Sequence, residues 1–161
     1  MIEILLSELT SGIPNTTQLA QAIVRMLAAM LLGAVVGFQR EQSGSTAGLR
    51  THILVALGTT LFVLASTGDD MSSDSASRVI QGIATGIGFI GAGAILKLSE
   101  TREIQGLTTA AGIWMTAAIG VSIGSGRLGL ALLGTIFTWV VLEVIGHFEN
   151  KLKKIKPQKS V

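Results

Sequence analysis

The sequence predicts an all-α membrane protein, a polytopic bundle of five transmembrane helices, from its low charge, its hydropathy and its glycine content. Asp, Glu, Lys and Arg make up 14% of the 161 residues, whereas a soluble globular chain carries about 25%. The mean hydropathy is +0.62, and glycine occupies 20 positions. The absence of cysteine excludes disulfide scaffolds, thiolate metal sites and thiol nucleophiles. So little charge cannot cover the surface of a soluble domain.

Five segments are apolar and long enough to cross a bilayer, which takes about 20 residues. Short polar stretches separate these segments. None of the apolar segments shows the alternating pattern of a membrane β-strand. The expected spans are Leu19–Phe38, Thr51–Gly68, Val79–Leu98, Leu107–Ile123 and Leu128–Ile145. They form one domain over residues 19–146, flanked by segments 1–18 and 147–161.

The two flanking segments differ in character. Segment 1–18 lacks the basic start of a secretory signal, and its apolar spacing predicts an amphipathic helix on the outer membrane surface. The apolar residues are Ile2, Leu5, Leu6 and Leu9. Asn15 or Thr16 is expected to cap the first span. The C-terminal tail is basic, so we expect it to contact anionic lipids and, without aromatic partners, no nucleic acid. The lysines expected to make the lipid contact are Lys151, Lys153, Lys154 and Lys156.

The loop charges predict the orientation of the bundle. The loops on one side, with the tail, hold nine Lys and Arg residues, and those on the other side hold two, Arg78 and Arg127. Cytoplasmic loops are the basic ones. We therefore expect the N-terminus outside and the C-terminus in the cytoplasm of a bacterial inner-membrane protein.

Thirteen of the 20 glycines lie inside the expected spans. Five of them lie in the third span: Gly82, Gly86, Gly88, Gly91 and Gly93. Small residues let membrane helices approach closely, so we interpret these glycines as packing faces that place the third span at the centre of the bundle. An alternative is that Gly86–Gly93 is an unwound point near a ligand. Gly33-xxx-Gly37 and Gly120-xxx-Gly124 are further packing patches, for neighbouring helices or for a second subunit.

Neither a cofactor nor a metal site is expected. Gly86–Gly91 matches the dinucleotide pattern G-x-G-x-x-G, but it lies within a span and lacks the acidic residue about 20 positions further on. Glu143 is the one acidic residue inside a span. A Mg²⁺ or Ca²⁺ path needs clustered oxygen ligands, and the expected spans do not offer them.

Two intramembrane charges call for an explanation, because such charges are costly and often functional. Arg25 either serves a function or extends to the outer surface to pair with Asp69 or Asp70. Glu143 lies near the cytoplasmic end of the fifth span, with His147 on the same face. It is either a surface carboxylate or part of a substrate path.

Polar residues gather where the first, second and fourth spans reach the cytoplasm. We call this set the cytoplasmic rim: Arg40, Glu41, Arg50, Thr51, His52, Thr108 and Thr109. Two helix N-termini lie there, and their free N–H groups favour an anion or a partner's carboxylates. Two alternatives remain open. In one, the threonines only cap the helices, and in the other, an Arg–Glu network joins the first two spans.

The same stretches resemble the MgtC/SapB family of bacterial inner-membrane proteins. The resemblance runs from about Leu31 to Leu142, through Gly33–Glu41, Ala47–His52, Gly86–Gly93 and Gly106–Ala111 with Trp114. It implies about five membrane helices, a link to growth at low Mg²⁺ and restraint of the F-type ATP synthase. Virulence-type members carry a soluble cytoplasmic domain after the last helix. We expect this chain to correspond to the transmembrane part alone.

We therefore expect a non-enzymatic membrane regulator of ion or energy homeostasis that acts through the cytoplasmic rim. Its expected partners are anionic lipids, a membrane complex such as the F-type ATP synthase, and other copies of the chain. The alternatives are a small oligomeric transporter or channel for an ion, with Gly86–Gly93 near its path, and a scaffold subunit held by its glycine faces.

Overall fold

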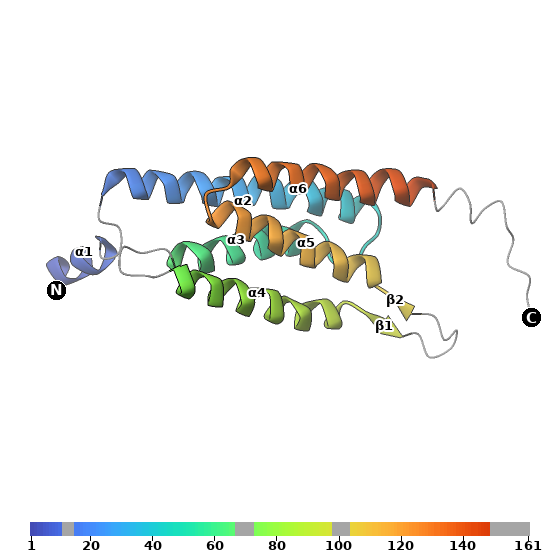
Figure 1. Ribbon diagram of the computed structural model, residues 1–161, viewed down its shortest axis with the longest axis horizontal. Coiled ribbons are helices and arrows are strands. Elements are labelled where there is room, and N and C mark those ends of the chain that lie inside the picture. The colour runs from blue at the N-terminus through green and yellow to red at the C-terminus, as the bar shows by residue number, and fades with distance from the viewer. Residues whose placement is uncertain (11–14, 67–72, 98–103, 149–161) are drawn as a thin grey trace, which may run out of the picture.

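The computed structural model describes residues 1–10, 15–66, 73–97 and 104–148 of the chain. Within these ranges the fold is helical apart from one pair of two-residue strands (Figure 1). The helices are α1 Ile2–Thr10, α2 Thr16–Gln42, α3 Leu49–Ala65, α4 Ser73–Gly93, α5 Leu107–Gly124 and α6 Leu128–Val140, which continues as the π-helix η1 Val141–Ile145. The strands are β1 Leu96–Lys97 and β2 Ile104–Gln105. A helix thus begins within six residues of the start of each expected span.

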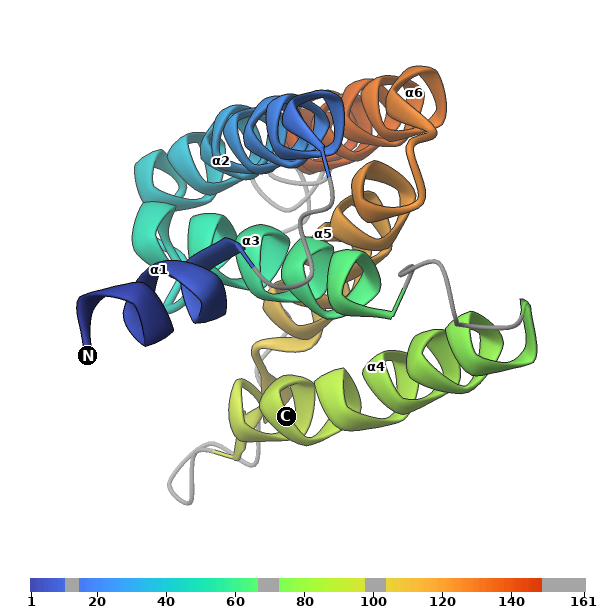
Figure 2. The same ribbon diagram turned by 90° about the vertical axis from the view of Figure 1, so that its left-hand side faces the viewer.

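The long helices run alternately up and down the long axis of the molecule (Figure 1). Viewed along that axis, α2 and α6 form one layer, α3 and α5 lie beneath it, and α4 lies outermost on the other side (Figure 2). The short helix α1 lies apart at the end where α2 begins. Asn15 caps α2 by accepting a hydrogen bond from the backbone N–H of Gln18 at 2.8 Å, which confirms one of the two expected caps.

The central helix is α5, because it contacts α2, α3, α4 and α6. Its buried side chains Ile119 and Ile123 belong to one apolar cluster, and Ile113 and Ala117 belong to a second. The first cluster joins α2, α3, α5 and α6, and the second includes Ile87 of α4. The bundle is therefore organised around the fourth expected span.

The prediction that the third span is central is wrong. This span forms α4, which lies at the edge of the bundle (Figure 2). A Cβ atom added to four of its glycines would meet no atom within 4 Å: Gly82, Gly86, Gly88 and Gly93. Only Gly91 of the five approaches another helix, at 3.6 Å from the Cβ of Ala110. Within one chain, these glycines leave a face open instead of bringing helices together.

Close approach occurs instead on the two sides of α3. From α2, Gly33 lies against the carbonyl of His52, and an added Cβ would come within 2.9 Å of its oxygen. From α5, a Cβ on Gly120 would come within 2.6 Å of the carbonyl oxygen of Ala56. Gly37 makes a similar contact one turn nearer the N-terminus of α3, against Leu49, and Gly124 makes one a turn nearer its C-terminus, against Val63. The two patches Gly33-xxx-Gly37 and Gly120-xxx-Gly124 therefore pack against a neighbouring helix, as expected.

Three of the described helices are long and apolar enough to cross a membrane: Thr16–Gln42, Leu107–Gly124 and Leu128–Phe148. The apolar helix α3 has 17 residues and is shorter. These helices indicate an all-α membrane bundle. The count of five spans and the orientation stay predictions.

The third expected span ends early because a β-hairpin replaces its last turn. Helix α4 stops at Gly93, and Leu96 and Lys97 then pair antiparallel with Gln105 and Ile104. Gly106 follows with φ +92°, packed against the backbone of Ala94. A left-handed conformation at so close a contact favours glycine. This hairpin places the start of α5 beside the end of α4.

Candidate functional site

The residues of the cytoplasmic rim lie at one end of the bundle, but they separate into four environments. Arg40 is buried, contacts Thr109 and lines a polar pocket together with Thr108. His52 is 0% exposed inside the bundle. Glu41 lies on the surface at the start of α3. Arg50 and Thr51 lie beside an apolar groove. The rim is therefore not one continuous surface.

His52 belongs to the core. Its Nδ1 lies 2.7 Å from the hydroxyl of Thr116, which donates its own proton to the carbonyl of Gly112 at 2.9 Å. The Thr116 hydroxyl therefore bridges the imidazole and the backbone of its own helix, and Nε2 of His52 is buried as well. An added Cβ at Gly37 would come within 3.1 Å of the His52 Cβ. The motif residue thus fixes α3 between α2 and α5, and the expectation that it faces the rim surface is wrong.

Glu41 caps the start of α3 and joins the first two spans. Its carboxylate accepts a hydrogen bond from the backbone N–H of Leu49 at 2.8 Å. The rim threonines do not cap, since the N-cap residues of α3 and α5 are Gly48 and Gly106. A carboxylate at a helix N-terminus is favoured by the helix dipole. The connection between the first two spans is therefore a carboxylate–backbone bond.

A polar pocket of about 500 Å³ lies where the end of α2, the first turn of α5 and η1 meet. Its lining residues are Gln39, Arg40, Ser43, Thr108, Val141, Leu142, Glu143, Ile145, Gly146 and His147. Hydrogen bonds to neighbouring side chains position Arg40. Its Nη2 donates to the Thr109 hydroxyl at 3.4 Å, and that hydroxyl lies 3.0 Å from the Ser45 hydroxyl. Single-turn π-helices are frequent at functional sites, and η1 forms one wall.

Two buried polar atoms of this pocket have no partner. Gln39 is 5% exposed, and its Nε2 donates to Ser43 Oγ and to Glu143 Oε2, both at 3.1 Å. Its Oε1 is unpaired, and so is the Nε of Arg40, which is 9% exposed. Buried polar groups are nearly always hydrogen-bonded. The pocket wall therefore contains one unpaired acceptor and one unpaired donor, both of them buried.

Sequence reasoning placed Arg40, Thr108 and Glu143 near this end but did not join them, and it missed Gln39. Gln39 and Ser43 are four residues apart, and so are Glu143 and His147. This spacing places both members of each pair on one helix face, and it is the feature of the sequence that indicates two polar faces here. That the last helix lies against α2 followed only from the fold (Figure 1).

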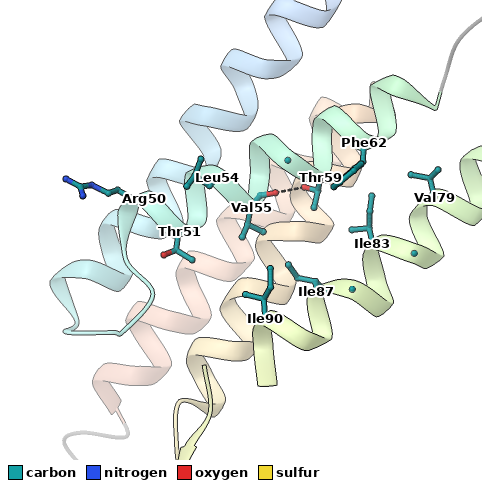
Figure 3. A pocket seen from close by; sticks show the side chains of 13 residues that line it. Arg50, Thr51, Leu54, Val55, Thr59, Phe62, Val79, Ile83, Ile87 and Ile90 are labelled. Carbon is teal, nitrogen blue, oxygen red and sulfur yellow. Dashed lines mark hydrogen bonds between the residues drawn. The ribbon is translucent and has the colours of Figure 1, made fainter. Parts of the chain in front are cut away.

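Arg50 and Thr51 lie at the end of a groove between α3 and α4 (Figure 3). The groove has a volume of about 710 Å³. Its other lining residues are Leu54, Val55, Gly58, Thr59, Phe62, Val79, Gly82, Ile83, Gly86, Ile87 and Ile90. The Arg50 guanidinium is exposed and projects away from α4 (Figure 3). This part of the predicted rim borders an apolar surface.

Arg25 caps the far end of α5. Its Nη1 donates to the carbonyl of Gly124 at 2.9 Å, and cations at helix C-termini are stabilising. Asp69 and Asp70, its expected alternative partners, lie outside the described residues, as do Lys151, Lys153, Lys154 and Lys156 of the tail. Within the described ranges, no group of three or more His, Asp or Glu residues is placed to hold a metal ion.

Residues 26–151 match the MgtC family. The chain is 47% identical over 129 residues to SrpB of Synechococcus elongatus, an alignment that covers 73% of this chain and 71% of SrpB. It is 44% identical over 140 residues to YhiD of Escherichia coli, described as a candidate magnesium transporter, with 83% and 64% covered.

It is also 46% identical over 114 residues to MgtC of Salmonella typhimurium, an alignment that covers 71% of this chain and 48% of MgtC. The chain thus spans about half of that relative and under two thirds of YhiD. No solved structure matches. The family match and the apolar helices indicate a bacterial membrane protein. The match covers most of the chain, and the resemblance read from its motifs is confirmed: this chain belongs to the MgtC family.

Proposed function

We propose that this chain is a non-enzymatic, multi-pass protein of the bacterial inner membrane that regulates Mg²⁺-linked ion or energy homeostasis. It acts by binding a partner at the polar pocket between α2, α5 and η1. The proposal rests on one observation, that Arg40 Nε and Gln39 Oε1 are buried in the pocket wall without hydrogen-bond partners. The link to Mg²⁺ comes from the names of the relatives.

The pocket suits an occupant that has both a hydrogen-bond acceptor and a hydrogen-bond donor. The free Arg40 Nε–H needs an acceptor, and the free Gln39 Oε1 needs a donor. A peptide segment supplies both, because each peptide unit has one C=O and one N–H group. Glu143 and His147 add polar groups on the facing wall. A loop of a larger membrane complex, such as the F-type ATP synthase, suits this polarity.

The packing beneath the pocket favours binding over conduction. The cluster formed by Ala29, Val36, Ala56, Ile119, Ile123 and Ala131 fills the space between α2, α3, α5 and α6. The buried threonine hydroxyls nearby are already committed, since Thr60 donates to the carbonyl of Gly120 at 2.9 Å and Thr116 to that of Gly112. A hydrated Mg²⁺ ion loses its water molecules reluctantly and needs oxygen ligands in their place. Apolar packing does not supply such ligands.

Transport of an ion is the second candidate, and the description of YhiD favours it. The two candidates differ in reconstituted membranes. A regulator gives no Mg²⁺ flux in proteoliposomes that contain this protein alone. A Mg²⁺ flux above that of empty liposomes, and lost in the variant Glu143→Gln, would establish transport and overturn the regulator proposal.

The positive test is complementation in a bacterial strain that lacks its own MgtC-family protein. We expect wild-type protein to restore growth at limiting Mg²⁺ and to co-purify a membrane partner in mild detergent. Gln39→Leu removes the amide and Glu143→Gln removes the negative charge from the pocket wall, so both variants should lose the partner and the growth.

The matched control is Glu41→Gln. It makes the same chemical change at the same end of the bundle, outside the pocket lining, and its amide oxygen still accepts from Leu49 N–H. Glu41→Gln should behave as wild type. Equal loss in Glu41→Gln and Glu143→Gln, or full activity of both pocket variants at normal expression, would reject the polar pocket as the site.

A further inference from the structure

The groove between α3 and α4 exists because glycines line it on both sides. An added Cβ at Gly58 of α3, or at Gly82 and Gly86 of α4, would meet no atom within 4 Å. The remaining wall is formed mainly by aliphatic side chains such as Val55, Ile83 and Ile87 (Figure 3). Its volume of about 710 Å³ lies within the range of small-molecule sites.

The middle of the groove does not need a hydrogen-bond partner from an occupant. The hydroxyl of Thr59 donates to the carbonyl of Val55 within its own helix at 2.8 Å (Figure 3). Apolar side chains continue on both sides as far as Phe62 and Val79. An occupant must therefore be apolar along most of its length.

One end of the groove is different, because Arg50 stands there. Its guanidinium projects outward from the start of α3, as an arginine does when its charged end extends from an apolar surface to the headgroup region (Figure 3). The charge count places this end in the cytoplasmic leaflet, where anionic lipids are concentrated.

The length of the groove matches one leaflet. Arg50 and Phe62 mark its two ends on α3, and the twelve residue steps between them rise about 18 Å. Half of the bilayer's hydrocarbon core is about 15 Å. A transmembrane helix from a second copy would need the full thickness of about 30 Å, so the dimensions favour an acyl chain.

We propose that this groove is a binding site for an anionic phospholipid. The phosphate accepts hydrogen bonds from the Arg50 guanidinium, and one acyl chain lies between α3 and α4 over Gly58, Gly82 and Gly86. The site is separate from the polar pocket and does not depend on the function proposed for it. It also gives the open glycine face of α4 a role.

The test uses a tryptophan at the apolar end of the groove. Phe62→Trp in a Trp114→Phe, Trp139→Phe background is reconstituted in phosphatidylcholine, and brominated phosphatidylglycerol or brominated phosphatidylcholine is titrated in. Quenching then reports the relative binding of the two lipids. We expect phosphatidylglycerol to be favoured about fivefold, the effect of one basic residue at an anionic surface. Arg50→Gln should reduce this preference to about onefold.

Two leucine substitutions on α4 separate the groove from the rest of the helix. Gly86 lines the groove and Gly88 does not, and both have open space around an added Cβ. Gly86→Leu should abolish the preference for phosphatidylglycerol, and Gly88→Leu should keep it. Insertion and helix content by circular dichroism confirm that each variant is folded.

An equal preference in wild type and Arg50→Gln, or in Gly86→Leu and Gly88→Leu, would overturn the proposal. Occupation of the groove by a second copy of the chain would also overturn it. In that case Gly86→Leu would change the oligomeric state seen by crosslinking, and neither lipid would quench the tryptophan of the Phe62→Trp protein that has no further substitution in the groove.

Discussion

The Nδ1 atom of His52 lies 2.7 Å from the hydroxyl oxygen of Thr116, and this bond joins α3 to α5 where both side chains are fully buried. The same hydroxyl also bonds the carbonyl of Gly112 at 2.9 Å. The His52–Thr116 bond is therefore a direct polar link between the two helices. Removing the Thr116 hydroxyl leaves Nδ1 of His52 buried without this partner.

Thr116→Val keeps the shape of the side chain and removes the hydroxyl that bonds Nδ1 of His52. A buried polar atom left without a partner costs about 1–3 kcal/mol, so the variant should unfold at a lower temperature in detergent. Thr135→Val is the control, because Thr135 is also buried but donates only within its own helix, to Ala131 at 2.9 Å. Equal losses in the two variants would contradict a special role for the His52–Thr116 bond.

Composition and hydropathy were sufficient to predict the helices and their order, because each span is a continuous apolar run between polar turns. They did not predict which helix is central. The third span has more glycines than any other expected span, but a small side chain permits close approach without requiring it. Two glycines each on α2 and α5 make the close contacts, because α3 lies between those helices.

The candidate site was predictable only in part. The motif around Arg40, Arg50 and His52 placed these residues at one end of the bundle, and polarity at a helix end is visible in a sequence. Whether such a side chain faces a pocket, a groove or the core depends on the rotation of its helix. His52 faces the core and Arg50 faces outward, although only one residue separates them. Gln39 and Glu143 meet across 104 positions of sequence.

Gly120→Ala should separate α3 from α5. An added Cβ would overlap the Thr59 hydroxyl and approach the carbonyl oxygen of Ala56 to 2.6 Å. Overpacking typically costs about 1–3 kcal/mol, and backbone atoms yield less readily than side chains. Gly88→Ala places the same methyl group in open space and should leave stability unchanged or raise it. The yield of monodisperse protein and the thermal unfolding temperature compare the two, and a destabilised Gly88→Ala would contradict the open face of α4.

Gly106→Ala should disturb the junction between α4 and α5. The residue has φ +92° and packs against the backbone of Ala94, so alanine meets both conformational strain and a steric clash. Gly44 also has a positive φ, +71°, but open space around it. Gly44→Ala should therefore show only the conformational cost of about 1–2 kcal/mol, and Gly106→Ala should be clearly less stable in thermal unfolding. Equal stability of the two variants would show that the contact with Ala94 is not tight.

Arg25→Met tests whether the intramembrane charge is structural. The guanidinium donates to the carbonyl of Gly124 at 2.9 Å and lies close to Gly126, which turns the chain toward α6 with φ +75°. Hydrogen bonds to charged groups contribute about 1.5–3 kcal/mol, so Arg25→Met should lower the thermal unfolding temperature. Arg25→Lys should recover part of the loss, and Arg78→Met, at an exposed arginine, should have little effect. The folded fraction of Arg25→Met should still support growth at limiting Mg²⁺, because Arg25 bonds the C-terminus of α5, whereas the polar pocket adjoins the first turn of that helix. Loss of growth at unchanged stability would instead assign Arg25 a functional role.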